Sequence, residues 1–188
     1  MVDKGYDIWV NNSRGVKYSD KNERDGEWSL KERWDFNWAD MGYYDVPAGI
    51  EYIISETGAK QVTVAAHSQG SSQMWYALSH RQDYFAEKIN RFVSLASCVI
   101  PEVYPGVPTD YKGLVSLFLR AEELGIYNVN GADDSSMPVG DMFCLVLENP
   151  LICFANEVVK WSGFATSAGA QSMGSFFYYA QTLIENRF

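Results

Sequence analysis

A serine flanked by small residues carries the strongest chemical signal in the sequence. Ala66-His67-Ser68-Gln69-Gly70 joins a β-branched run, residues 61–66, to a stretch of helical character, residues 70–80. The pattern matches the nucleophile turn G-x-S-x-G, with Ala66 in place of the first glycine. Such a turn strains the serine backbone, so the residues two positions away must be small. We expect Ser68 Oγ to be a nucleophile and the Gln69 backbone N–H to be an oxyanion donor. The alternative is a helix start rich in Ser and Gly, without catalysis.

A serine nucleophile also needs a histidine at hydrogen-bond distance, and neither histidine of the sequence fits that role. His67 precedes the serine, and successive strand residues face opposite sides of a sheet. His80 lies twelve positions further on, which along a helix is roughly 18 Å. We therefore predict that this sequence does not contain a complete catalytic triad.

The elements around this serine alternate between strand and helix. Strands are predicted over residues 6–10, 61–66 and 92–96, and helices over residues 46–57 and 70–80. This order implies parallel strands with helical crossovers, and therefore an α/β sheet.

Residues typical of helix ends flank the helix predicted over residues 46–57. Asp45 is predicted to be its N-cap, with Pro47 in the first turn, and Gly58 is predicted to stop it. Before it, residues 16–42 are polar, charged and rich in Trp, and we interpret them as a long excursion over the surface.

The second half of the sequence loses the strand–helix alternation. Prolines and glycines break residues 101–113 into turns, and helices are predicted over residues 114–124, 143–147 and 176–184. We therefore predict a partial α/β core in residues 1–100 and a mostly helical cap in residues 101–188. The aromatic run Phe176 to Tyr179 could line a lipid site or pack in a core.

Composition excludes several function classes. The chain has 188 residues, 47% of them hydrophobic, which suits one globular domain, and a net charge of −9 without a basic stripe argues against nucleic acid. Three Cys and two His do not make a zinc site, and no cofactor is indicated. Apolar runs such as residues 93–100 are too short to span a bilayer, and the first residues do not resemble a signal peptide. Cys144 and Cys153 could form a disulfide in an oxidising compartment or remain core thiols.

Blocks spread over residues 5–100 resemble the acid lipase family of gastric and lysosomal lipases in order and spacing. The blocks are Gly5-Tyr6-Asp7-Ile8-Trp9, Asn12-Ser13-Arg14-Gly15, Tyr18-Ser19, Phe36, Asp40-Met41-Gly42, Tyr44-Asp45, Pro47-Ala48, Ile53, Thr57-Gly58 and His67-Ser68-Gln69-Gly70. The likeness is weaker in the second half, around Ala168-Gly169, Ser172 and Gln181, where Tyr178 stands in place of a frequent His.

The resemblance implies an α/β-hydrolase fold and hydrolysis of lipid esters, either acylglycerols or sterol esters. It implies that Ser68 is the nucleophile, that Arg14 is structural, and that residues from about 100 onward cover the acyl-chain site. It also implies transient contact with a lipid surface and a secreted or lysosomal location.

In that family the triad acid and histidine follow the point matching Phe188, and a second oxyanion donor precedes the point matching Val2. The sequence is therefore expected to be an internal fragment of a lipase. One hypothesis is a serine ester hydrolase completed by other sequence. The alternative is a catalytically inactive, lipid-binding relic, and a further enzyme reading is a general esterase or thioesterase.

Overall fold

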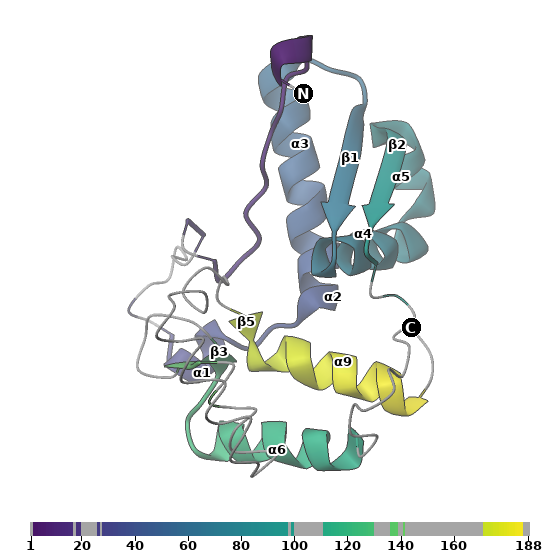
Figure 1. The fold of residues 1–188 in the computed structure, drawn as a ribbon. Coiled ribbons are helices and arrows are strands. Elements are labelled where there is room, and N and C mark those ends of the chain that lie inside the picture. The colour runs from purple at the N-terminus through teal and green to yellow at the C-terminus, as the bar shows by residue number, and fades with distance from the viewer. Residues whose placement is uncertain are drawn as a thin grey trace. The chain divides into compact units, whose positions relative to one another are not determined.

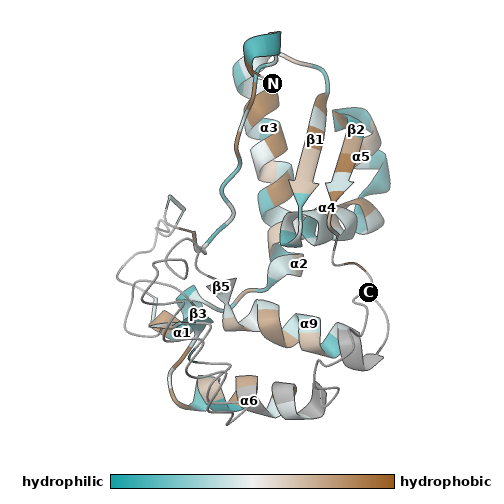
Figure 2. Cartoon of the chain, in the orientation of Figure 1, coloured by the Kyte–Doolittle hydropathy of each residue, from teal (hydrophilic) through white to brown (hydrophobic). Residues whose placement is uncertain are grey.

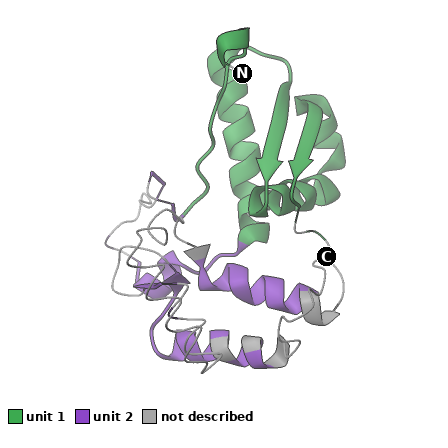
Figure 3. Ribbon diagram, in the orientation of Figure 1, with its two compact units in different colours: residues 1–14, 38–99 green, residues 15–37, 100–188 purple. Residues whose placement is uncertain are grey.

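The computed structural model describes residues 2–16, 18–19, 26, 28–97, 99, 111–129, 136–138, 141 and 171–185. The chain divides into two compact units (Figure 3). Met1–Arg14 and Trp38–Val99 form unit 1, whereas Gly15–Asn37 and Ile100–Phe188 form unit 2. The assignment of residues 101–188 as a cap stays a prediction.

Unit 1 is built on two parallel strands, β1 (Val62–His67) and β2 (Ile89–Leu95) (Figure 1). In chain order, α3 (Val46–Thr57) precedes β1, and α4 (Gln69–His80) and α5 (Gln82–Lys88) connect the strands. The apolar core of these elements consists of Ile50, Met74, Ala77 and Phe85, packed by Val62, Val64, Ile89 and Phe92. The predicted α/β alternation is confirmed, although β2 begins three residues earlier than predicted and α5 was not predicted.

Side chains alternate between the two faces of this sheet. Val62 and Val64 contact the core, while Thr63, Ala65 and His67 are exposed. On β2, Val93 and Leu95 are 38% and 49% exposed. Parallel sheets are normally covered on both faces, and the described residues cover one. Figure 2 shows apolar residues in both strands. Some of them lie on the packed face of the sheet, and others lie on the face that the described residues leave exposed.

The segment before α3 differs from its prediction. Residues 6–10 are not a strand, and every residue from Val2 to Asn12 is exposed. A strand needs a neighbour for its backbone hydrogen bonds, and in the described part of the chain β1 pairs with β2 alone. Trp9 instead packs edge-on against Tyr52 of α3.

Asp45 precedes α3 but does not cap it. The chain enters α3 through α2 (Trp38–Asp40) and the π-helix η2 (Met41–Asp45), so Asp45 is itself helical. Its carboxylate accepts hydrogen bonds from the Arg14 backbone N–H at 2.9 Å and from the Arg14 guanidinium at 2.6 Å. The N-cap prediction is therefore wrong, whereas Gly58 ends α3 as predicted, at φ 69°. The structural role that the family resemblance implied for Arg14 fits this ion pair.

Glu51 joins α3 to α5. Its carboxylate accepts a hydrogen bond from the Tyr84 hydroxyl at 2.7 Å and lies 3.3 Å from Lys88 Nζ. The hydrogen bond from Tyr84, followed by that from Lys88, lowers the pKa of Glu51. Burial and the bond to Glu51 raise the pKa of Tyr84 to about 12.

Tyr84→Phe is expected to destabilise unit 1 below pH 10 and to matter less as the pH approaches 12. The raised pKa means that folding favours the neutral phenol, so this contribution is complete below the ordinary pKa of about 10 and is lost towards 12. Urea unfolding of both proteins across this range measures the difference. A stability difference that stays constant with pH would contradict the assignment.

Unit 2 contains α1 (Leu30–Arg33), α6 (Tyr111–Glu123) and α9 (Met173–Glu185), with a small sheet of order β4-β3-β5. These strands are Asn128–Val129 (β3), Ser136–Met137 (β4) and Gln171–Ser172 (β5). The core comprises Phe118, Ala121, Val129, Met173 and Ala180. Two of the predicted helices are confirmed by α6 and α9, and Phe176 and Phe177 pack against this core. The predicted helix 143–147, Cys144 and Cys153 lie outside the described residues.

The predicted surface excursion over residues 16–42 is wrong for its last part. Trp34 and Phe36 stack on each other in unit 2 and are 5% and 8% exposed. Ser172 Oγ donates to the carbonyl oxygen of Phe36, which ties this segment to the start of α9. Trp38 and Met41 are buried in unit 1.

Candidate active site

The predicted turn lies between β1 and α4. Ser68 follows the last residue of β1 and precedes the first of α4, and it adopts φ 51° and ψ −122°. A side chain in this backbone region costs roughly 1–3 kcal/mol, so its surroundings must hold it there. The Ser68 N–H donates to Leu95 O at 2.9 Å, and the Ser68 carbonyl accepts from the Ser71 N–H at 2.9 Å. The strained turn expected from the sequence is thus present.

The small residues flanking the turn face each other. A Cβ placed on Gly70 would lie 3.7 Å from Ala66 Cβ, an ordinary van der Waals contact. Two small side chains therefore fit where the sequence pattern usually has two glycines. This explains why Ala66 is accommodated at the first glycine position.

Gln69 opens α4, where backbone N–H groups lack acceptors within the helix. Positive charge at a helix N-terminus attracts a developing oxyanion. The Gln69 side chain points elsewhere, because its Nε2 lies 3.6 Å from Met41 Sδ. The geometry is compatible with the predicted oxyanion donor, which stays a prediction.

The two histidines of the sequence lie at different ends of α4, His67 directly before the turn and His80 at the last residue of the helix. His67 belongs to the exposed set of β1 residues, next to half-buried Ala66. His80 ends α4 and stacks on Tyr76, with ring centroids 4.1 Å apart. Its Nδ1 lies 2.9 Å from Ser79 Oγ and 3.0 Å from Tyr76 O. His80 is therefore committed to the end of α4 remote from Ser68.

A buried polar group supports the first turns of α4, and sequence reasoning missed it. Gln73 is 7% exposed, accepts from Ser13 Oγ at 3.3 Å and donates to Met41 Sδ at 3.0 Å. These contacts join residues from three separate stretches of chain. The spacing of residues along the sequence does not indicate these contacts. Ser13 and Met41 do, however, lie in sequence blocks that resemble the acid lipase family.

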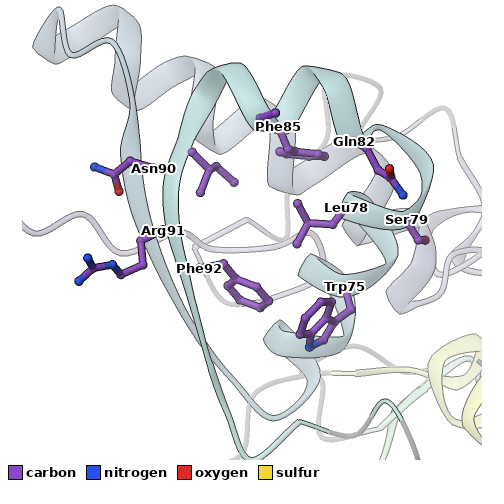
Figure 4. A pocket seen from close by; sticks show the side chains of 10 residues that line it. Trp75, Leu78, Ser79, Gln82, Phe85, Asn90, Arg91 and Phe92 are labelled. Atoms are coloured by element: carbon purple, nitrogen blue, oxygen red, sulfur yellow. The ribbon is translucent and has the colours of Figure 1, made fainter.

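An apolar hollow of about 500 Å³ opens beside the second half of α4 (Figure 4). It is lined by Trp75, Leu78, Ser79, Gln82, Phe85, Ala86, Ile89, Asn90, Arg91 and Phe92. Ser68 is not among these residues. Within the described residues no helix has the length and apolar character to cross a membrane. The same residues contain no cluster of metal-binding side chains.

Ser68→Gly is expected to be more stable than Ser68→Ala by about 1 kcal/mol. The backbone of Ser68 lies in a region that glycine enters without a Cβ penalty, and the Ser68 side chain does not cap α4. The loss of the hydroxyl is common to both variants, so the comparison isolates the strain. Denaturant unfolding measures it, and equal stability would mean that the turn is relaxed.

Comparison with known proteins gives a consistent picture. Residues 2–123 match the sequence profile described as the alpha/beta hydrolase fold. Lipase lipl-3 of Caenorhabditis elegans is 34% identical over 137 residues, which cover 71% of this chain and 32% of that protein.

Two mammalian proteins are similarly related. Gastric triacylglycerol lipase of Mus musculus is 40% identical over 119 residues, 63% of this chain and 29% of that lipase. Lysosomal acid lipase/cholesteryl ester hydrolase of Macaca fascicularis is 37% identical over 99 residues, 53% of this chain and 24% of that enzyme. The chain thus spans about a quarter to a third of the length of these relatives.

Proposed function

Because the chain belongs to the alpha/beta hydrolase fold family, we propose that it is the nucleophile-bearing part of a lipid ester hydrolase, with Ser68 as the nucleophile. The observation that carries this proposal is the strained backbone of Ser68 between β1 and α4. A non-glycine residue held at φ 51° is costly, and such strain concentrates at functional sites.

In this mechanism Ser68 Oγ attacks the ester carbonyl carbon and passes its proton to a base. The carbonyl oxygen becomes an oxyanion, which the Gln69 N–H stabilises, and the alcohol then leaves with a proton. Water hydrolyses the acyl-enzyme. Since His67 belongs to the exposed residues of β1 and His80 lies at the far end of α4, we propose that the base and its acid come from sequence beyond this chain.

The relatives support a lipid substrate and a location outside the cytosol. Their names specify triacylglycerol and cholesteryl ester, and gastric and lysosomal origin. We propose an acylglycerol or sterol ester as substrate, with transient contact at a lipid surface. No nucleic acid partner is proposed, given the net charge of −9.

A second candidate is a lipid-binding protein without catalysis. The exposure of His67 and the stacking of His80 on Tyr76 favour it, because a serine nucleophile needs a base at hydrogen-bond distance. The two candidates differ in whether Ser68 becomes reactive when the remaining lipase sequence is supplied.

A chimera provides that test. The matched 119-residue segment of mouse gastric triacylglycerol lipase is replaced by the corresponding part of this chain. A fluorophosphonate probe is expected to label the chimera at Ser68, and to label the isolated chain slowly or not at all. A folded chimera without labelling, or one labelled at another residue, would contradict the proposal.

A further inference from the structure

We infer that Ser71 is a positioning residue that holds Ser68 in its strained backbone conformation, an inference that rests on the proposed role of Ser68. Ser71 is fully buried in the first turn of α4. Its hydroxyl lies 2.7 Å from the carbonyl oxygen of Ala66 and 3.2 Å from that of Leu95. The hydroxyl proton is therefore shared between the ends of β1 and β2.

These bonds are not the usual ones for a serine in a helix. A helical Ser hydroxyl commonly bonds a carbonyl three or four residues earlier in its own helix. Ser79 does this, since its Oγ donates to Tyr76 O at 2.8 Å. Ser71 instead reaches five positions back, across the turn, to Ala66 of β1. The hydroxyl thus connects α4 to the sheet.

The acceptors of Ser71 surround Ser68 on both sides. Leu95 O also accepts the Ser68 N–H at 2.9 Å, and the Ser71 N–H donates to Ser68 O at 2.9 Å. Ser71 therefore holds the Ala66 carbonyl before Ser68 and the Ser68 carbonyl itself, and it shares the acceptor Leu95 O with the Ser68 N–H. Immediately beyond Leu95, Ala96 is the other described non-glycine residue with positive φ, at 47°. The Leu95 carbonyl group thus accepts the N–H of one residue with positive φ, Ser68, and is bonded directly to the other, Ala96.

If the hydroxyl is removed, Ala66 O loses its 2.7 Å contact, and Leu95 O retains the Ser68 N–H. We expect the turn to relax and the side chain at position 68 to move from the N-terminus of α4. Global folding would change less, because alanine fits the space of the buried serine and the apolar contacts of the unit 1 core stay in place.

The test uses the thiol of Ser68→Cys as a probe of position, which does not require a catalytic base. Iodoacetamide alkylation at this position is followed against pH in the full chain, with peptide mass spectrometry separating it from Cys98, Cys144 and Cys153. A thiol at a helix N-terminus ionises below the free value of about 8.5. Adding Ser71→Ala is expected to move the profile to higher pH and to slow alkylation at pH 7 about fivefold.

Ser71→Thr keeps a hydroxyl and is expected to retain the parent profile within about twofold. Ser79→Ala is the matched control, at the other end of α4, and should leave the profile unchanged. The inference is overturned if Ser71→Ala leaves the profile unchanged, if Ser79→Ala shifts it equally, or if Ser71→Thr shifts it as Ser71→Ala does. Should Ser71→Ala lose its near-UV circular dichroism, the Ser71→Thr profile decides. A Ser71-dependent profile with an unreactive chimera would instead overturn the proposed function alone.

Discussion

Ser68→Ala in the gastric lipase chimera is expected to lower kcat for triacylglycerol hydrolysis by at least about 10⁴-fold. In the proposed mechanism Ser68 Oγ forms the acyl-enzyme, and the substitution leaves no nucleophile at that position. KM should change little, because the apolar contacts of the substrate are unaltered. Initial rates on an emulsified triacylglycerol and on a soluble short-chain ester measure the effect in both substrate classes.

Ser79→Ala is the control for this experiment, because Ser79 lies on the same helix but its hydroxyl bonds within the helix. Its activity should match that of the unmodified chimera within about twofold. If Ser68→Ala retained more than a tenth of the activity, Ser68 would not be the nucleophile. A preference for the short-chain ester would favour the hypothesis of a general esterase over that of a lipase.

Local sequence signals were sufficient to predict the turn and its flanking elements. The β-branched run before Ser68 and the small residues around it specify strand, turn and helix within residues 61–80. Gly58 ends α3 through its own backbone conformation, at φ 69°. The α/β fold follows from this alternation, and the family match over residues 2–123 confirms it.

Features that depend on distant partners could not be predicted in this way. Asp45 stands before Pro47 as an N-cap would, but its carboxylate bonds Arg14, which lies 31 positions earlier. The carbonyl oxygen of Phe36 accepts a hydrogen bond from Ser172, 136 positions later. A charged, Trp-rich stretch is therefore predicted to lie at the surface when its distant contacts are not known. The same limit applies to Gln73, whose contacts at Ser13 and Met41 have no common spacing.

Gly42→Ala is expected to destabilise unit 1 by about 2–3 kcal/mol. Gly42 lies in η2, and a Cβ built on it would be only 2.4 Å from the backbone oxygen of Gln73 in α4. A backbone oxygen in a helix cannot rotate away, so η2 or α4 must shift. Either movement disturbs the buried contact between Gln73 and Met41.

Gly70→Ala is the opposite case and serves as the matched control. Its new Cβ would meet only Ala66 Cβ at 3.7 Å, and alanine in a helix is favoured over glycine by up to about 1 kcal/mol. We therefore expect Gly70→Ala to be neutral or stabilising, so that the two variants differ by about 3 kcal/mol. Denaturant unfolding followed by Trp fluorescence measures both. If Gly42→Ala were as stable as Gly70→Ala, then η2 and α4 would not be in close backbone contact. The claim that the contact between Gln73 and Met41 supports the first turns of α4 would then be wrong.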